Sequence, residues 1–260
     1  MRKKSLSTII LFLSCMQCGF VVFGQIGKLS FDFSAANQFW KMSSLNQYLT
    51  DPLNADHIYS TNNPYLKSGI KFQGALNYQF ANYLMLGFYG NYQFATCTMD
   101  RNFVVYDPTD NTATNFKTDL FTKANTLSFG VNLGVSYDNL SKHLFKTKYL
   151  QQIKFSNQIK VGYAQSNLQS YYVFKEPSQI EFPKNSGASQ HLVGDLSLSV
   201  AFPILTNPFF SSIGLNVGYQ LYKSGIILNA ANQSISISNG TQVHLDFSGW
   251  YAGLNFELGK

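Results

Sequence analysis

Two long runs near the start of the chain, residues 70–80 and 84–94, alternate apolar and polar side chains and are separated by three residues. One face is aromatic and aliphatic: Ile70, Phe72, Leu76, Tyr78 and Phe80 in the first run, and Leu84, Leu86, Phe88, Tyr92 and Phe94 in the second. A period of two residues predicts strands, and the short connection predicts a hairpin. Both runs are about twice as long as a typical soluble strand and match the roughly 9–11 residues that a tilted strand needs to cross a bilayer.

The opposite face of the first run carries Lys71, Gln73, Asn77 and Gln79, which cannot also contact lipid. The sheet must therefore close around its polar face. Charged residues make up only 12% of the chain and aromatic residues 16%, yet the mean hydropathy is −0.08, because apolar and polar residues alternate instead of clustering. No break in composition divides the chain. We therefore predict one all-β domain, a membrane-spanning antiparallel up-and-down β-barrel over residues 25–260.

The N-terminal segment differs in kind. Basic residues at positions 2–4 precede an apolar stretch, and Gly24 stands just before Gln25, which predicts a secretory signal peptide over residues 1–24. Cys15 and Cys18 lie within it, and cleavage before Cys15 as a lipoprotein is the alternative. Only Cys97 then remains, which excludes an internal disulfide and a cysteine-based zinc site. Removal of the three basic residues halves the formal charge of +6, too little to indicate a nucleic-acid partner.

The same alternation recurs along the chain and predicts eight strands, at about 28–39, 70–80, 84–97, 127–137, 153–163, 192–202, 213–221 and 243–258. Residues 40–67, 98–123 and 166–189 are expected to be long loops, and they alternate with short turns. Eight strands with short periplasmic turns place both termini in the periplasm. In the last strand, the odd-numbered Val243, Leu245 and Phe247 are expected to face outward, and so is the even-numbered Trp250. The outward set thus shifts by one residue, which predicts a bulge near Ser248 and Gly249.

Aromatic residues near the predicted strand ends suit the interfacial girdles of such barrels: Phe39, Trp40, Tyr83, Tyr137, Tyr163, Tyr222 and Trp250. The chain resembles the small outer-membrane β-barrels of Gram-negative bacteria, and more narrowly the barrel proteins of Bacteroidota. The resemblance rests on Gly24 before Gln25, on the alternating strands and on the closing residues 249–258. It implies insertion by the outer-membrane assembly machinery and contact with outer-membrane lipid. It implies no particular substrate.

The predicted inward face collects opposite charges and two histidines: Lys28, Asp32, Lys71, Lys154, Lys160, His191, Asp195, His244, Asp246 and Glu257. An eight-stranded barrel is only just wide enough for its side chains to fill, and a desolvated unpaired charge is costly. A lumen plugged by these pairs is therefore expected. The alternatives are a narrow pore, acid/base chemistry at the His and Asp residues, and a metal bound by them.

We therefore expect a structural or interaction protein that acts through its external loops on envelope partners, with no cofactor and no catalytic or metal site. A pore for ions or small apolar molecules is the second hypothesis, and a lipid-directed enzyme the third. A soluble lipocalin-like barrel is the alternative fold; it would need an apolar interior, whereas Lys and Asp stand at the predicted inward positions.

Overall fold

The computed structural model describes residues 28–50, 58–60, 66–81, 83–107, 109, 112–137, 140–174, 180–181, 185–204, 210–236 and 240–258. The predicted signal peptide, residues 1–24, lies outside these residues. None of the helices in these ranges is long and apolar enough to cross a bilayer.

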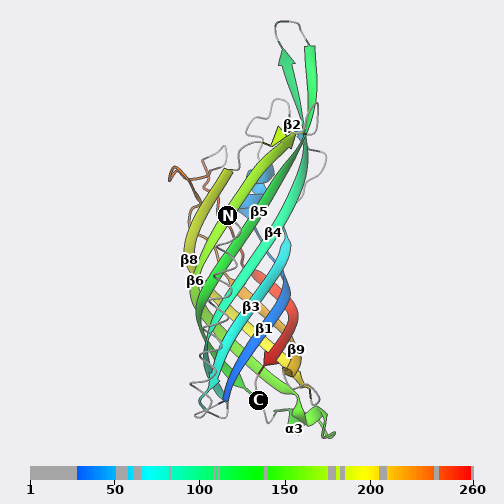
Figure 1. Ribbon diagram of the computed structural model, residues 1–260, viewed down its shortest axis with the longest axis vertical. Coiled ribbons are helices and arrows are strands. Elements are labelled where there is room, and N and C mark those ends of the chain that lie inside the picture. Colours follow the sequence, from blue (N-terminus) through cyan, green and yellow to red (C-terminus); the bar gives the residue numbers. More distant parts are fainter. Residues whose placement is uncertain are drawn as a thin grey trace.

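Eight antiparallel strands form a closed ring, as predicted (Figure 1). In ring order they are β1 (Lys28–Phe39), β3 (Ser68–Gln79), β4 (Leu84–Asp107), β5 (Thr112–Ser136), β6 (Lys154–Phe174), β8 (Asn185–Pro203), β9 (Phe210–Leu221) and β11 (Gly249–Leu258). β11 closes the ring by pairing with β1, from Phe31 opposite Leu258 to Gln38 opposite Tyr251. Closure gives every strand of the ring two neighbours and leaves no free sheet edge at this level.

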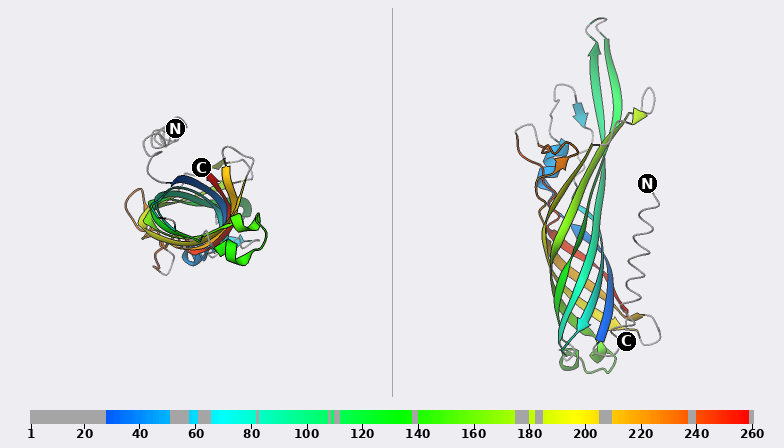
Figure 2. Two further views of the ribbon diagram at one scale, coloured as in Figure 1. Left: turned by 90° about the horizontal axis from the view of Figure 1, so that it is seen from below. Right: turned by 60° about the vertical axis from the view of Figure 1, so that its left-hand side comes forward.

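The two ends of the barrel differ. At one end, here called the turn end, β1 begins, β11 ends and the short β3–β4 connection lies, together with α3 (Leu140–Leu144) and a 3-10 turn (Leu150–Gln152). At the other, the hairpin end, β4 and β5 continue far beyond the ring as a two-stranded ribbon (Figures 1 and 2). Both ends of the described chain, Lys28 and Leu258, lie at the turn end. The connections between successive strands of the ring therefore lie alternately at the hairpin end and at the turn end.

The outer surface of the ring carries a belt of exposed large apolar side chains. Phe88 is 70% exposed, Trp250 67% and Leu192 66%. β1 has 12 residues. At about 3.3 Å per residue and a tilt of about 40°, it rises roughly 28 Å, close to the ~25 Å height of the apolar band on membrane barrels. The belt therefore has the composition and the height of a lipid-facing surface.

Towards the hairpin end the outward positions change from apolar to polar. On β5 the exposed Leu127 is followed by the exposed Lys123, and on β6 the exposed Tyr163 is followed by the exposed Gln165. On β8, Leu192 gives way to Gln190, which is also exposed. The belt thus has a sharp upper margin, and the longer strands extend beyond it.

Three of the expected loops contain more regular structure than the sequence indicated. Residues 40–67 hold the helix α2 (Ser43–Thr50) and the short β2 (Ile58–Ser60), which pairs with β4. Most of residues 98–123 lies in the ribbon formed by β4 and β5. Residues 166–189 extend β6 and begin β8, and β7 (Ile180–Glu181) and β10 (Leu228–Asn229) pair with these two strands. Turn-rich composition hid strands that continue past the belt, because there the outward face is polar.

The bulge predicted near Ser248 and Gly249 is wrong. Val243, Leu245 and Phe247 are each fully buried instead of facing outward, so their parity continues through Gly249 and Tyr251, which are also buried. The one register shift in the β11–β9 ladder falls between Glu257 and Leu258. A strand that packs against an apolar interior has the same alternating sequence pattern as a strand that faces lipid, which explains the error.

The belt margin gives a quantitative expectation for stability. Val131→Arg lies in the middle of the belt, so it should lower the free energy of unfolding in lipid vesicles by about 2–4 kcal/mol. Gln165→Arg, just beyond the margin, should cost only about 0–1 kcal/mol. Guanidinium titration of the two variants in the same vesicles measures the difference. Equal costs would show that the margin does not separate lipid from water.

Candidate functional site

The middle of the barrel interior is crossed by a buried ion cluster of two lysines and one aspartate. Lys71 on β3 forms an ion pair with Asp195 on β8, and Lys160 on β6 lies 3.4 Å from the second carboxylate oxygen of Asp195. All three side chains are at most 1% exposed. Three charges without solvent are stable only when their partners satisfy them closely, so this cluster closes the lumen at its level.

Polar neighbours complete the coordination of these charges. Lys71 Nζ donates to Gln220 Oε1 at 3.0 Å and lies 3.7 Å from the centre of the Tyr251 ring. Tyr251 donates its hydroxyl to Asp195 Oδ1 at 2.8 Å, and Lys160 Nζ donates to Ser197 Oγ at 2.8 Å. Gln220 is in turn linked to Gln93 of β4. The network therefore joins strands from all sides of the ring.

Glycine makes room for the largest side chain in this network. A Cβ atom at Gly218 on β9 would stand 2.5 Å from the hydroxyl and the ring of Tyr251. The inward glycine at this position is thus required by the close approach of the tyrosine. A residue with a side chain there would displace Tyr251 from both Asp195 and Lys71.

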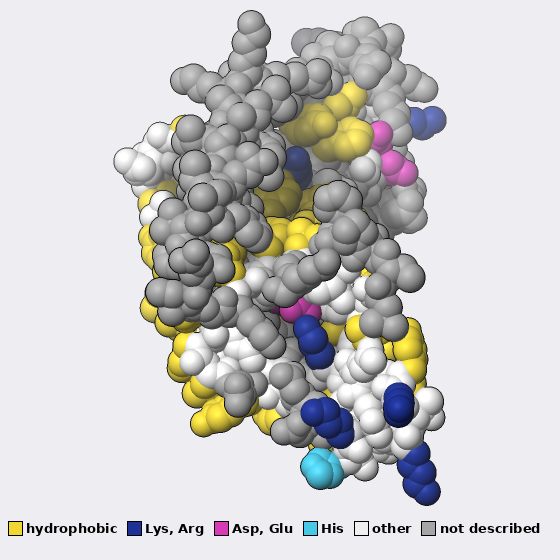
Figure 3. All heavy atoms as spheres, turned by 60° about the horizontal axis from the view of Figure 1, so that its bottom comes forward, with side chains coloured by type: hydrophobic (Ala, Val, Ile, Leu, Met, Phe, Trp, Pro, Cys, Tyr) yellow, Lys and Arg dark blue, Asp and Glu magenta, His cyan; other side chains and the backbone are white. Residues whose placement is uncertain are grey.

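A second polar layer lies closer to the turn end. Asn77 Nδ2 donates to Asp32 Oδ2 at 2.6 Å, and Asn77 Oδ1 accepts from Asn132 Nδ2 at 2.5 Å. Lys154 Nζ lies 3.0 Å from Glu257 Oε2, and these two side chains are 45% and 21% exposed. They line a cavity of about 220 Å³ that also holds Asp32. Viewed towards this end, acidic and basic side chains lie side by side near the centre of the face, with hydrophobic side chains along the flanks (Figure 3).

Towards the hairpin end the interior contains a large apolar cluster, together with small hydroxyl side chains such as Thr122, Ser166 and Ser170. Seventeen buried residues form one cluster, here called the mouth cluster: Trp40, Met42, Leu45, Leu49, Leu66, Ala95, Met99, Leu120, Ala124, Ala164, Leu168, Val193, Tyr222, Ile227, Val243, Leu245 and Phe247. Inward side chains of β4, β5, β6 and β8 supply its wall. α2, with Met42 just before it, and the segments 222–236 and 240–247 supply most of the rest of the cluster. They lie at the hairpin end of the barrel (Figure 2).

Specific contacts hold this filling in place. The ring of Trp40 meets that of Phe247 edge to face at a centroid distance of 5.0 Å. Gln38 on β1 donates Nε2 to the carbonyl of Phe247 at 2.8 Å. Tyr222 and Ser166 share a hydrogen bond of 2.7 Å between their hydroxyls. Buried side chains therefore cross the interior at two levels, as the ion cluster in the belt and as the mouth cluster beyond it.

The structure does not gather all the predicted lumen residues. Lys71, Lys160 and Asp195 form the ion cluster, and Lys154 and Glu257 form the pair at the turn end. Asp32 accepts a hydrogen bond from Asn77 and forms no ion pair with the side chains that the structure describes. Lys28 is opposite Gln79 on β3, but its side chain lies outside what the structure describes.

His191, His244 and Asp246 lie apart from the lumen network. His191 is on the inward face of β8, opposite the buried Ala164, as predicted, whereas His244 and Asp246 do not face the interior. His191 is exposed where β8 extends beyond its ladder with β9, which ends at Gly194 and Leu221. His244 and Asp246 alternate with the buried Val243, Leu245 and Phe247, so they lie on the opposite face of that segment. His244 Nδ1 is 3.1 Å from the carbonyl of Ser224, and Asp246 accepts from the backbone N–H of Ser248.

No arrangement for catalysis or metal binding emerges from these positions. Within the described ranges, no three His, Cys, Asp or Glu residues gather as metal ligands.

The prediction of an aromatic girdle needs correction at two residues, because Trp40 and Tyr222 are only 6% and 1% exposed and belong to the mouth cluster. Phe39, Tyr83, Tyr137, Tyr163 and Trp250 are exposed at the margins of the belt.

Comparison with known proteins gives similarity to solved barrel structures only. No family model and no curated protein matches the chain. Ail, the attachment invasion locus protein of Yersinia pestis, is 11% identical over 89% of this chain and 98% of its own, with a TM-score of 0.35. OprG from Pseudomonas aeruginosa is 11% identical over 90% and 97%, with a TM-score of 0.40. A major outer membrane protein from Thermus thermophilus is 13% identical over 88% and 99%, with a TM-score of 0.43. Because these TM-scores are below 0.5, we draw no conclusion about this chain's function from them, and the narrower resemblance to Bacteroidota stays an expectation.

The two ion pairs of the lumen should differ strongly in their contribution to stability. Asp195→Asn leaves two fully buried lysines without a counter-charge and should cost about 3–5 kcal/mol in free energy of unfolding. Glu257→Gln breaks the partly exposed pair with Lys154 and should cost no more than about 1 kcal/mol. Denaturant unfolding in lipid vesicles measures both values. A cost for Asp195→Asn as small as that for Glu257→Gln would show that the cluster is hydrated and does not close the lumen.

Proposed function

We propose that this protein is an integral outer-membrane β-barrel with a closed lumen, which acts as a structural or interaction protein through the segments at its hairpin end. The apolar belt around an antiparallel ring, with polar side chains inside, supports a location in a bilayer. The turn end then faces the periplasm and the hairpin end the exterior, as short periplasmic turns and longer external loops favour. Chain insertion would use the outer-membrane assembly machinery, as the resemblance implies.

Two layers of buried side chains across the interior are the observation that carries this proposal. Water-filled passage would need both the Lys71–Asp195–Lys160 cluster and the mouth cluster to open. The first is an ionic network, and the second is held by apolar burial, so no single change in charge or in polarity opens both. Binding at the exterior needs neither layer to move.

The ribbon of β4 and β5 is the external segment best placed for an envelope partner. The two strands stay paired from Cys97 opposite Thr122 to Asp107 opposite Thr112, well beyond the belt margin (Figure 1). A paired ribbon holds a contact surface away from the membrane, and its pairing lowers the entropic cost of binding relative to an irregular loop. The partner we propose is another protein of the envelope, since the formal charge of the chain gives no reason to expect nucleic acid.

Passage of small apolar molecules is the second candidate, and one observation favours it. The interior of the hairpin end contains the apolar mouth cluster, and the ladder between β8 and β9 stops at Gly194 and Leu221 although β8 continues to Asn185. Beyond that point this edge of β8 pairs only with the two residues of β10, so the wall there has a shorter ladder than elsewhere in the ring. This route requires the buried side chains of the mouth cluster to separate.

The closed lumen is tested by conductance of the refolded chain, residues 25–260, in a planar bilayer. We expect the unchanged protein to be silent. Lys71→Ala/Asp195→Ala should also be silent because the mouth cluster still closes the lumen, and so should Met42→Ser/Leu45→Ser/Leu49→Ser because the ion cluster does. Only the variant that combines all five changes should conduct. Steady openings of the unchanged protein that respond to Lys71→Ala/Asp195→Ala would overturn the closed lumen and favour a pore.

The external contact is tested by cross-linking in cells. A photoreactive residue at Lys117, exposed on the ribbon, should give a discrete adduct with another envelope protein. The same residue at Tyr149, exposed at the turn end, is the matched control and should not give that adduct. The same adduct from both positions would contradict a contact specific to the hairpin end.

A further inference from the structure

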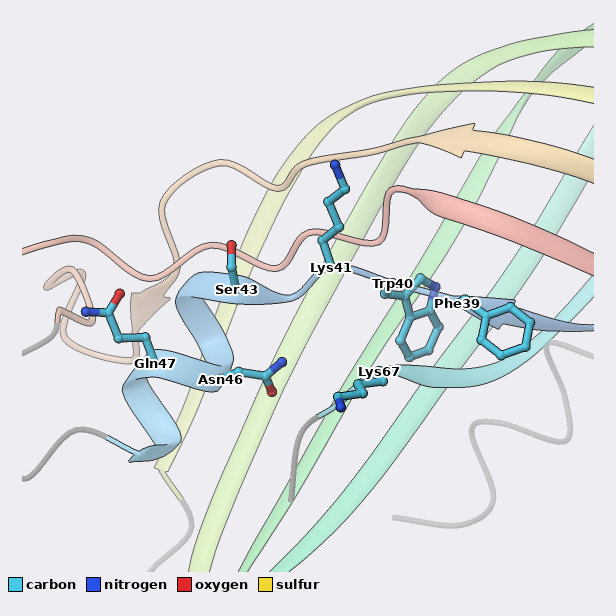
Figure 4. A pocket seen from close by; sticks show the side chains of 7 residues that line it. All are labelled: Phe39, Trp40, Lys41, Ser43, Asn46, Gln47 and Lys67. Atoms are coloured by element: carbon cyan, nitrogen blue, oxygen red, sulfur yellow. The ribbon is translucent and has the colours of Figure 1, made fainter. Parts of the chain in front are cut away.

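An open groove lies on the outside of the barrel, where α2 approaches the upper ends of β1 and β3. It has a volume of about 730 Å³, within the range of small-molecule sites. α2 lines one side through Ser43, Asn46 and Gln47, and Phe39 and Trp40 lie on the other; Lys67 stands below Trp40, where the chain enters β3 (Figure 4). The groove is thus built from three segments that the fold holds rigidly together.

The groove is basic and rich in hydrogen-bond donors. Lys41 and Lys67 line it and are both exposed, and no acidic residue of the described chain is among its lining residues. The hydroxyl of Ser43 adds a neutral donor, whereas the amide of Asn46 is engaged with the backbone of Leu66 and holds the two walls of the groove together. The indole Nε1 of Trp40 is buried without a hydrogen-bond partner among the described residues, so it is a further donor beside the groove. Two ammonium groups with neutral donors beside them suit a phosphate group.

One wall of the groove is also a continuation of the lipid-facing belt. Phe39 is 56% exposed and is the last residue of β1, and Trp250, 67% exposed, is at the start of the neighbouring β11. The register of these strands, with Gln38 opposite Tyr251, places the two rings at the same height. The groove therefore opens at the belt margin, where lipid headgroups meet the protein.

We infer that this groove binds the phosphate headgroup of an anionic lipid in the leaflet at the hairpin end. Lys41 and Lys67 pair with the phosphate, and the acyl chains run down the belt past Phe39. The bound lipid would tie α2, and with it Met42, Leu45 and Leu49 of the mouth cluster, to the membrane surface. This inference rests on the proposed membrane location but not on the closed lumen, so a barrel that conducts ions leaves it intact.

Trp40 provides the reporter for a direct test. The chain has two tryptophans, so Trp250→Phe leaves Trp40 beside the groove as the only one. We would refold this variant in a non-ionic maltoside micelle and follow Trp40 fluorescence during titration with dihexanoylphosphatidate. A saturable change is expected. Lys41→Gln/Lys67→Gln should raise the dissociation constant at least about tenfold, as expected for the loss of charge-assisted hydrogen bonds.

Three controls define the ligand. Lys123→Gln removes an exposed lysine from β5, away from the groove, and should leave the dissociation constant unchanged. Dihexanoylphosphatidylcholine, which has the same chains without net charge, should bind at least about tenfold more weakly. Inorganic phosphate should compete only at far higher concentration. Equal binding of the choline lipid, equal competition by inorganic phosphate, or an unchanged constant in Lys41→Gln/Lys67→Gln would each overturn the lipid-headgroup site.

Discussion

The margin of the apolar belt is the constraint on which the rest of the structure depends, because polarity inverts there. Below it the outward positions are apolar and the interior is polar, with Phe88 and Val131 outside and Lys71, Lys160 and Asp195 inside. Beyond it the same strands place Lys123 and Gln165 outside and Leu120 and Leu168 inside. A strand alternates with a fixed period of two, so this inversion is achieved by exchanging the residue types on the two faces while the register continues.

Each half of the interior then follows from what surrounds it. Inside the belt the wall faces lipid, and polar lumen side chains hydrogen-bond to one another across the interior, as the linked contacts of Gln93, Gln220, Lys71 and Asp195 illustrate. Beyond the margin the outer face is wet, and the interior resembles the core of a soluble barrel. There α2 and the segments 222–236 and 240–247 supply the apolar surface that the ring alone lacks. The two halves close the barrel by opposite means.

Residue patterns predicted the ring well and the mouth poorly. Alternation of period two identified all eight strands and put Lys71, Lys160 and Asp195 on one face, because in the belt the two faces differ in polarity. It misplaced Val243, Leu245 and Phe247, because apolar residues alternate in the same way against lipid and against the mouth cluster. α2 was missed among turn residues, although Met42, Leu45 and Leu49 recur at helical spacing and all are buried. The ion cluster itself depends on which strands face each other across the ring, which periodicity does not encode.

The most direct test of the polarity inversion is the environment of single outward positions. In a chain with Cys97→Ser, spin labels on cysteines placed at Phe88, Val131, Leu198, Lys123, Gln165 and Gln190 would be compared in lipid vesicles for relaxation by oxygen, which concentrates in lipid, and by a water-soluble nickel chelate. We expect oxygen to dominate at the first three positions and the chelate at the last three, with the change between Leu127 and Lys123 on β5. Similar oxygen and chelate effects at all six positions would contradict the account, since the belt would then have no margin and the chain no membrane boundary.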